Sequence, residues 1–576
     1  MRKLLKYLKD YKKESILGPL FKLLEASFEL FVPLVIARII DIGILNKDMN
    51  YVLKMGGMLV VLGIIGLVCS ITAQYFAAKA AVGFGTAVRS QLFRHLNRFS
   101  YEEMDQIGSA TLITRITSDI NQVQAGVNMV LRLFLRSPFI VFGAMIMAFT
   151  VDTKSAMVFV ITIPVLSIII FGIMAISMPI YKKIQKYLEQ ITLVTRENLV
   201  GVRVIRAFNQ QEKECAQFDE ESNLLLKSQK YVGKIAGLLN PLTYIVINVA
   251  IIMIIWVGGK QVNTGRLTQG EVVALVNYMS QILVELIKLA NLIITTTKSF
   301  ACASRIQMVF EMQPSIVYAD NSKETQECYT DDMVVFEHVN FAYGDSAENA
   351  LTDIHFRVKK GETIGIIGGT GSGKSSIINL IPRFYDVKSG KVLIHGMDVR
   401  DYSKEALQSK IGIVPQKAVL FKGTIRENLQ WGKKDATTEE MNQAISIAQA
   451  EEFVKEHGLD YKIQQGGKNL SGGQRQRLTI ARALVKRPEI LILDDSASAL
   501  DFATDARLRK AIQEETKDMT VFIVSQRAAS IRHADQIFVL DDGRIVGSGT
   551  HEFLLKSCDI YREICLSQFS KEEVGV

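Results

Sequence analysis

Long apolar runs alternate with charged stretches over the first half of the chain, and this alternation ends near residue 312. Six of these runs reach the length of about 20 residues that a helix needs to cross the hydrocarbon core of a bilayer. We therefore predict six membrane spans, at residues 16–40, 53–76, 131–150, 155–178, 238–258 and 270–297.

The connections between these spans are of two kinds. Three are short and carry few positive charges, whereas two are long and basic, with four arginines between residues 89 and 115 and seven basic residues between 182 and 213. Because basic loops stay on the cytoplasmic side of membranes, we place the long connections and both termini in the cytoplasm, in a multi-pass protein of the inner or plasma membrane. Apolar residues recur at helical spacing over 88–99 and 181–208, so we expect the spans to continue as helices below the membrane.

Three acidic residues fall inside the predicted spans, namely Glu25, Glu29 and Glu285. A charge in the middle of a bilayer costs at least ~2.5 kcal/mol, so these positions need a compensating environment. In one interpretation they line a polar, cation-favouring substrate cavity. In the other they are paired internally, for example Glu25 with Lys22 and Glu285 with Lys288.

From residue 334 onward, short β-rich runs alternate with helical stretches, which predicts an α/β domain around a largely parallel sheet. A polar stretch rich in acidic and hydroxyl residues separates it from the apolar half. The fold class that we predict is a membrane α-helical bundle of six spans with long cytoplasmic extensions, followed by an α/β domain with a phosphate loop. The predicted boundaries are 1–311 for the helical domain, 312–332 for the linker and 333–576 for the α/β domain.

The phosphate loop has the pattern G-x-x-x-x-G-K-S and lies between a predicted strand, 363–367, and a predicted helix, 374–380. Its glycines allow backbone N–H groups to curl around phosphates, and the start of the helix adds a favourable potential. The loop comprises Gly368, Gly369, Thr370, Gly371, Ser372, Gly373, Lys374 and Ser375.

Two cofactors follow from this loop and from a distant acidic residue. Lys374 is expected to reach the β- and γ-phosphates of ATP, and Ser375 to bind Mg²⁺. Asp494 ends the apolar run 490–493 and is expected to hold the same Mg²⁺ through water.

With these residues and the segment Leu470-Ser471-Gly472-Gly473-Gln474, nearly the whole chain resembles ABC transporters of the exporter type. In that family two nucleotide-binding domains enclose two ATP molecules head to tail. Each ATP is held by the phosphate loop of one domain and the LSGGQ segment of the other. The resemblance therefore implies that four residues contact an ATP bound by a partner domain: Ser471, Gly472, Gly473 and Gln474.

The resemblance extends to further positions. Tyr343 resembles the aromatic residue that stacks on adenine, and Gln416 the glutamine that touches Mg²⁺ and the attacking water. The segment Ser498-Ala499-Leu500-Asp501 resembles the loop that crosses the dimer interface. The turns of the two long connections, at 100–109 (with Tyr101 and Asp105) and at 208–219, are expected to carry the motion of the nucleotide domains into the spans.

Two departures from the family pattern bear on the chemistry. Asp495 stands where the family has its general-base glutamate, and its shorter side chain withdraws the carboxylate by roughly 1.5 Å. A misplacement of about 1 Å can cost ~100-fold in rate. Gln526 replaces the histidine that contacts the γ-phosphate, so it can donate a hydrogen bond but cannot act as an imidazole. A third departure, 464–467, stands where the family usually has a Gly-Glu pair.

Exporters of this type also form heterodimers with one hydrolysing and one degenerate site, and this chain resembles the degenerate half of such a bacterial multidrug exporter. We predict a homologous half-transporter as partner, which carries the glutamate and the histidine. Two alternatives are a homodimer with slow hydrolysis by Asp495 and a membrane sensor that binds ATP without pumping. The expected cargo is hydrophobic or amphipathic (drugs, lipids or peptides). The net charge of +8 is ascribed to cytoplasm-facing loops and not to nucleic-acid binding.

Overall fold

The computed structural model describes the chain except residues 1–2, 320–330, 345–347, 497–499, 516–517 and 570–576. The chain divides into two compact units, which are described separately below. The first contains residues 1–97 and 110–312, and the second contains residues 98–109 and 313–576. The short segment 98–109 lies within the sequence range of the helical half, yet it belongs to the second unit.

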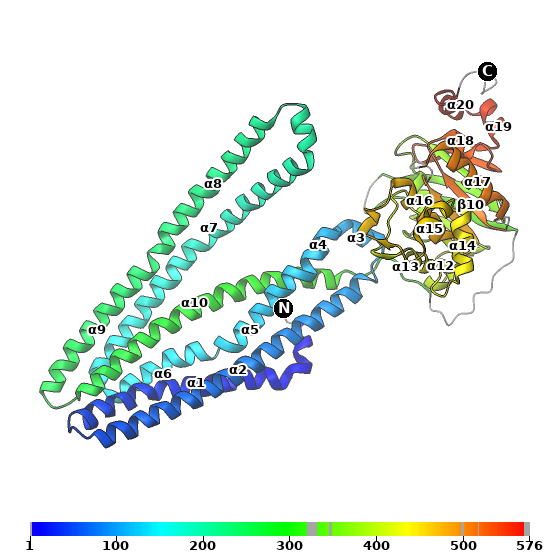
Figure 1. Ribbon diagram of the computed structural model, residues 1–576. Helices are drawn as coiled ribbons and strands as arrows, with labels where there is room; N and C mark the ends of the chain where they lie inside the picture. The colour runs from blue at the N-terminus through cyan, green and yellow to red at the C-terminus, as the bar shows by residue number, and fades with distance from the viewer. Residues whose placement is uncertain (1–2, 320–330, 345–347, 497–499, 516–517, 570–576) are drawn as a thin grey trace. The chain divides into compact units, whose positions relative to one another are not determined.

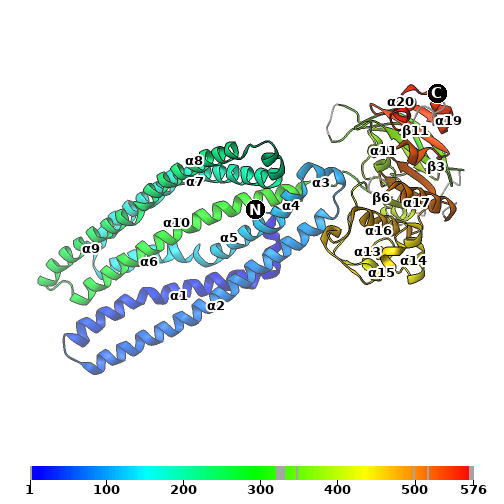
Figure 2. The ribbon, with the colours of Figure 1, turned by 45° about the horizontal axis from the view of Figure 1, so that its top comes forward.

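The first unit is built of long helices that run side by side, with α1 beside α2 and α7 beside α8 in both views (Figures 1 and 2). Its elements are η1 (Leu4–Tyr11), α1 (Lys12–Arg38), η2 (Ile39–Ile44), α2 (Met49–Leu96), α4 (Ser109–Thr114), η3 (Arg115–Asp119), α5 (Ile120–Leu133), α6 (Arg136–Val151), α7 (Thr153–Ala207), α8 (Gln211–Gly237), α9 (Leu239–Asn263) and α10 (Gln269–Glu311).

Five helical stretches are long and apolar enough to cross a membrane: Met49–Leu96, Ser109–Val151, Thr153–Ala207, Gln211–Asn263 and Gln269–Glu311. Each contains one of the predicted spans, so the chain is a multi-pass membrane protein. The helix of the first predicted span, α1, is also long enough at 27 residues, but it carries Lys22, Glu25 and Glu29 and is too charged to qualify by composition alone.

The helices are longer than a bilayer requires. At 1.5 Å per residue, the 55 residues of α7 extend for about 80 Å, against a hydrocarbon core of about 30 Å. The helical extensions predicted over 88–99 and 181–208 are therefore confirmed as continuous with the spans, since α2 ends at Leu96 and α7 at Ala207.

Small residues allow the helices of the first unit to approach closely, as is common between membrane helices. Ala73 and Ala77 of α2 are fully buried, and a Cβ atom on Gly18 of α1 would meet the backbone nitrogen of Ala77 at 3.3 Å. Fully buried Ala144 and Ala148 of α6 belong to one apolar core with residues of α1 and α10.

The second unit contains a six-stranded sheet in the order β12-β11-β3-β10-β9-β6, in which every neighbouring pair is parallel except β11 and β12. The predicted parallel sheet is therefore confirmed. Its strands are β3 (Thr363–Gly368), β6 (Ile411–Val414), β9 (Ile490–Asp494), β10 (Thr520–Val524), β11 (Gln536–Asp541) and β12 (Arg544–Gly549).

A four-stranded antiparallel sheet, in the order β2-β1-β4-β5, accompanies it. The sequence pattern does not distinguish this sheet from the parallel one, because short β-rich runs do not reveal their pairing partners. Its strands are β1 (Asp332–Phe341), β2 (Leu351–Lys359), β4 (Ser389–Ile394) and β5 (Met397–Asp398), and a separate pair is formed by β7 (Gly423–Thr424) and β8 (Lys462–Ile463).

Helices surround these sheets (Figure 1), and the segment 98–109 contributes one of them, α3. They are α3 (Tyr101–Ile107), α11 (Lys374–Leu380), α12 (Lys404–Lys410), α13 (Ile425–Gln430), α14 (Thr438–Ile447), α15 (Glu451–His457), η4 (Gln465–Gly467), α16 (Gly472–Leu484), α17 (Phe502–Glu515), α18 (Ala528–Ile531), α19 (His551–Ser557) and α20 (Asp559–Leu566).

The register of the parallel strands positions the site. β10 is paired with β3 through Val524 and Ile366, and with β9 through Val524 and Asp494. The carboxyl ends of β3, β9 and β10 therefore meet at one edge, which is where ligands bind in open α/β sheets.

Candidate functional site

The edge formed by β3, β9 and β10 encloses a small hollow of about 150 Å³. The structure brings the predicted catalytic residues and metal ligands together around it, although they are scattered over more than 150 positions of the sequence. The lining comprises Thr370, Gly371, Lys374, Ser375, Gln416, Asp494, Asp495, Val524, Ser525 and Gln526.

The phosphate loop connects β3 to α11, as predicted. Gly371 and Gly373 have φ values of +86° and +94°, a region that L side chains rarely adopt. A Cβ atom on Gly368 would lie 2.1 Å from the carbonyl oxygen of Leu540. The path of the loop therefore requires glycine at these positions.

Lys374 folds back over its own loop. Its Nζ donates to the carbonyl oxygens of Gly368, at 2.9 Å, and Gly369, at 2.5 Å. These two carbonyl oxygens accept the hydrogen bonds of the ammonium in this structure. Phosphate oxygens would be stronger acceptors for the same hydrogen bonds, because they are charged. Burial lowers the pKa of Lys374, against the opposing effect of Asp495 and Asp494, so an anionic group bound to the ammonium would offset the cost of its burial.

The residues present fit a divalent cation of the magnesium type. Ser375 Oγ lies 3.4 Å from both carboxylate oxygens of Asp494, and hydroxyl and carboxylate oxygens are the ligands that Mg²⁺ prefers. Burial raises the pKa of Asp494, and the neighbouring carboxylate of Asp495 raises it further. A bound cation would relieve both effects.

Asp495 has an unusual backbone, with φ at +43°, which is costly for a residue with a Cβ. Its N–H donates to the carbonyl oxygen of Val524 at 2.9 Å, and its Oδ2 accepts from Gln416 Nε2 at 3.4 Å. This turn directs the Asp495 carboxylate into the hollow. Burial raises the pKa of this carboxylate, which increases its affinity for a proton.

Gln526 follows β10 and also lines the hollow. The Gln568 side chain holds this segment in place, because its Nε2 donates to the Gln526 carbonyl oxygen at 2.8 Å and its Oε1 accepts from the Ala528 N–H at 2.8 Å. Gln568 was not predicted, because no motif links it to a position 42 residues earlier.

Tyr343 presents an aromatic ring at the surface of the second unit, with 42% of the residue exposed. Its hydroxyl lies 2.9 Å from Ser376 Oγ, one residue after the phosphate loop. The rings of Phe341 and Tyr385 contact it edge to face, with centroid distances of 4.7 and 5.2 Å. Tyr385 was not among the predicted residues.

The LSGGQ segment opens α16. Ser471 caps this helix by accepting from the Gln474 N–H at 3.2 Å, while the Gln474 side chain accepts from the Ser471 N–H at 2.9 Å. Among the described residues, Ser471, Gly472, Gly473 and Gln474 do not line the hollow. Two residues of the predicted interface loop, 498 and 499, lie outside the described residues.

The first of the two predicted coupling segments, 100–109, contains α3, which packs on the turn that follows α11. Tyr385 Oη donates to Asp105 Oδ2 at 2.6 Å, and the Tyr101 ring lies 4.6 Å from that of Phe384. The second segment, 208–219, forms the turn between α7 and α8 and the start of α8 in the first unit.

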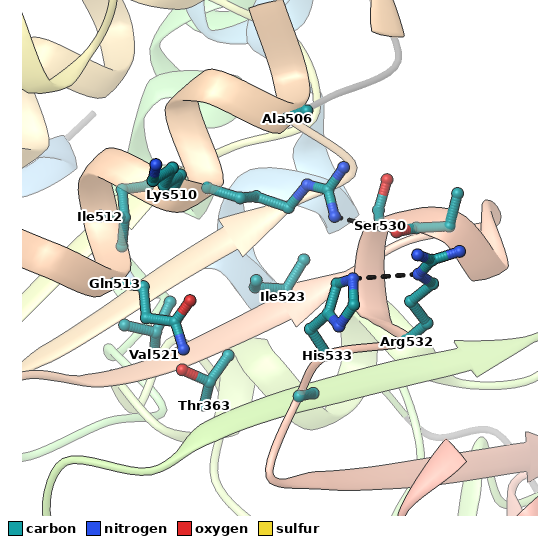
Figure 3. A pocket seen from close by; sticks show the side chains of 13 residues that line it. Thr363, Ala506, Lys510, Ile512, Gln513, Val521, Ile523, Ser530, Arg532 and His533 are labelled. Carbon is teal, nitrogen blue, oxygen red and sulfur yellow. Dashed lines mark hydrogen bonds between the residues drawn. The ribbon is translucent and has the colours of Figure 1, made fainter. Parts of the chain in front are cut away.

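A larger cavity, of about 390 Å³, lies between α17, α18 and β10 (Figure 3). Arg532 and His533 line it, and Arg532 Nε donates to His533 Nε2 at 3.0 Å. Within the part of the chain that the structure describes, this cavity contains none of the predicted site residues. The predicted catalytic residues and metal ligands lie around the smaller hollow instead.

In the first unit, the acidic residues inside the spans are paired. Lys22 Nζ lies 2.5 Å from Glu25 Oε2, and Lys288 Nζ lies 2.8 Å from Glu285 Oε1, as the second interpretation of the sequence predicted. Arg136 at the start of α6, which the sequence analysis missed, also contacts Glu285 at 2.5 Å and Glu29 at 2.7 Å.

Comparison with known proteins gives two family matches. The family described as "ABC transporter transmembrane region" matches residues 15–286, and the family described as "ABC transporter" matches residues 351–498. An uncharacterised ABC transporter ATP-binding protein of Mycobacterium tuberculosis (strain CDC 1551 / Oshkosh) is 35% identical over 574 residues, 99% of this chain and 98% of the relative.

Two further similarities agree with these. An ATP-dependent lipid A-core flippase of Desulfotalea psychrophila (strain LSv54 / DSM 12343) is 33% identical over 470 residues, 81% of this chain and 82% of the flippase. The solved structure of a bacterial Atm1-family ABC exporter with ATP bound has a TM-score of 0.80 at 22% identity, covering 97% of this chain and 99% of that one, so it shows the same fold.

Proposed function

The chain belongs to the ABC transporter family as an exporter-type protein with fused membrane and ATP-binding domains, and on this premise we propose that it is the catalytically degenerate half of a heterodimeric exporter. The family places ATP binding and an ATPase coupled to transport in the second domain. In the proposal, a homologous half-transporter in the cell membrane supplies the efficient catalytic site.

Binding of ATP with Mg²⁺ is supported by the geometry around the phosphate loop. Lys374 would exchange its two backbone carbonyl partners for phosphate oxygens, which are stronger acceptors because they are charged. Ser375 and Asp494 would hold Mg²⁺, whose charge would neutralise the adjacent carboxylates. Tyr343 offers an exposed ring on which adenine would stack.

The degenerate character rests on one observation, the short side chain of Asp495 in the position of the general base. Asp495 points into the hollow beside Gln416, but its carboxylate is one methylene shorter than that of a glutamate. Gln526 can hold a γ-phosphate oxygen by hydrogen bonding only. In this arrangement the site retains ATP and hydrolyses it slowly, while its LSGGQ segment completes the partner's site.

The pairing of charges in the spans supports a hydrophobic or amphipathic cargo. Glu25 and Glu285 each have a basic partner, so they do not present free carboxylates to a cationic compound. The apolar helices of the first unit provide the remaining surface.

The experiment is an ATPase assay of the chain in lipid nanodiscs, alone and co-purified with a homologous half-transporter from the same organism. Asp495→Asn is compared with the matching change of the partner's catalytic glutamate. We expect the partner's change to abolish turnover and Asp495→Asn to leave most of it. Transport into inverted vesicles, measured in parallel, separates an exporter from a sensor that hydrolyses ATP without flux.

The alternative is a homodimer in which Asp495 is a slow general base at both sites. The contact between Asp495 and Gln416, and the raised pKa of this carboxylate, favour that role. Full activity of the chain alone, abolished by Asp495→Asn, would establish the homodimer and reject the degenerate assignment.

A further inference from the structure

A continuous series of contacts connects α3 to Tyr343 within the second unit. It begins at Asp105, whose Oδ2 accepts a hydrogen bond of 2.6 Å from Tyr385 Oη. Bonds from a hydroxyl to an ionised carboxylate are short and roughly twice as strong as bonds between neutral groups. This bond joins residues that are 280 positions apart in the sequence.

The helix α3 is fixed at its first turn by a buried carboxylate. Glu103 is 4% exposed and accepts from the Ser100 N–H and from the Ser315 N–H, both at 2.8 Å. Because Ser315 belongs to the second unit, α3 is attached to this unit through two side chains, those of Glu103 and Asp105.

The hydroxyl of Tyr385 contacts Asp105, and its ring contacts Tyr343. Their rings meet edge to face at a centroid distance of 5.2 Å and an interplanar angle of 85°. Tyr343 is held in turn by its hydroxyl, 2.9 Å from Ser376 Oγ, and by the ring of Phe341. Such aromatic pairs have a preferred geometry, so a displacement of Tyr385 changes the environment of Tyr343.

We propose that Tyr385 is a positioning residue that connects the adenine-stacking ring of Tyr343 to α3. Through this connection the adenine base of ATP, independently of the phosphates, stabilises the docked position of α3. The proposal rests on the function proposed above, in which Tyr343 stacks on adenine. Lys374 and Ser375 bind the phosphates at the start of α11, whereas Tyr385 follows the end of that helix. Base and phosphates therefore act on the second unit at different points.

This arrangement makes a reciprocal prediction. If adenine binding stabilises the docked α3, then docking of α3 must strengthen the binding of adenine nucleotides by the same factor. A ligand with phosphates but no base receives no such gain. The difference between the two ligands therefore isolates the contribution of Tyr385.

The test uses the full-length chain in lipid nanodiscs and two Mg²⁺-containing ligands, the non-hydrolysable analogue AMPPNP and inorganic tripolyphosphate. Tyr385→Phe removes the hydroxyl that donates to Asp105 and keeps the ring. We expect this change to lower the affinity for AMPPNP by about fivefold or more and to leave the affinity for tripolyphosphate unchanged. Hydrogen exchange of residues 101–107 should slow on addition of AMPPNP in the wild type only.

The matched control is Tyr318→Phe, because Tyr318 is a tyrosine of the same unit whose hydroxyl donates to the Arg383 carbonyl oxygen at 3.4 Å, away from Asp105. It should leave both affinities unchanged. Asp105→Ala should reproduce the effect of Tyr385→Phe, and the double variant should be no weaker than either single one, since both changes remove the same bond.

Two results would overturn the inference. If Tyr385→Phe lowers the affinity for both ligands equally, or for neither of them, Tyr385 does not act through the base. If Tyr343→Leu leaves AMPPNP affinity unchanged, or the wild type binds no AMPPNP, the assignment of the adenine site is itself wrong and the inference falls with it. The first result leaves the proposed nucleotide site intact, so the two failures are distinguishable.

Discussion

Arg136 Nη1 lies 2.5 Å from Glu285 Oε1, and this contact joins the start of α6 to the middle of α10. The same guanidinium reaches Glu29 of α1 at 2.7 Å, so a single side chain connects three helices. The side chains of Arg136 and Glu285 are largely buried, with exposures of 7% and 3%. Together with Lys22 and Lys288, the group balances three acids with three bases.

Replacement of Arg136 by alanine should be strongly destabilising. It leaves the Glu285 carboxylate buried with Lys288 as its only cationic partner of this group, and breaking a buried ion pair by removing one member costs about 3–5 kcal/mol. The free energy of unfolding, measured with denaturant in mixed micelles, provides the test. Lys288→Ala is the control, since the Lys288 side chain is 40% exposed and its loss leaves Glu285 paired with Arg136. Equal losses for the two variants would contradict a central role of Arg136.

The packing of α10 against the end of α1 depends on Gly270. A Cβ atom there would lie 2.3 Å from the carbonyl oxygen of Ala37 and 2.6 Å from Asp41 Oδ2. Gly270→Ala should therefore destabilise the first unit by about 1–3 kcal/mol, as overpacking does. Gly259→Ala in α9 is the matched control, because a Cβ atom at Gly259 meets nothing within 4 Å. In thermal unfolding, Gly270→Ala should lower the melting temperature clearly, whereas Gly259→Ala should not lower it.

Lys374→Ala should weaken ATP binding without unfolding the second unit. The ammonium of Lys374 now bonds to carbonyls of its own loop, and hydrogen bonds to charged groups contribute about 1.5–3 kcal/mol. The expected loss is about ten- to a hundredfold in ATP affinity, which isothermal titration of the purified chain can measure. An unchanged affinity would exclude Lys374 from the phosphate site.

Asp494→Asn should stabilise the nucleotide-free chain at neutral pH. Burial raises the folded-state pKa of Asp494 above its unfolded value of about 3.9, so the ionised carboxylate destabilises the fold at higher pH. This penalty, and with it the gain from asparagine, should disappear as the pH falls below the unfolded pKa. Thermal melts between neutral and acidic pH would show it.

Glu440 is the control for this pH series, because its pKa is lowered in the folded chain, whereas that of Asp494 is raised. Lys433 donates to Glu440 and lowers its pKa, so this carboxylate stabilises the fold above its unfolded pKa. Glu440→Gln should lower the melting temperature at neutral pH, and the difference should vanish as the pH falls through the folded-state pKa. Parallel curves for the two variants would contradict the burial of Asp494 as the cause.

Local patterns predicted a large part of this protein. The pairs Lys22–Glu25 and Glu285–Lys288 could be anticipated, because residues three apart on a helix face the same way. Arg136 could not, since its partner Glu285 is 149 positions away and no periodicity links them. Tyr385 was missed for the same reason, as its partner Asp105 comes from the first long connection.

The site shows the same division. The phosphate loop between β3 and α11, and Asp494 at the end of β9, were predicted because each motif is contained within a strand, a turn and the start of a helix. The assignments of Asp495, Gln526 and Tyr343 rest on resemblance and stay predictions. The left-handed backbone of Asp495 and the attachment of Gln526 through Gln568 had no counterpart in any sequence pattern.

The sequence by itself indicated which segments are apolar enough to cross a membrane, that an α/β domain follows them and where a phosphate-loop motif joins a strand to a helix, since each of these patterns depends on residues close together in the chain. Only the tertiary structure decided which charges neutralise one another in the helical unit and which tyrosine lies between α3 and the candidate adenine site. Those relationships join positions more than a hundred residues apart, and their partners are chosen by packing, which a one-dimensional pattern does not encode.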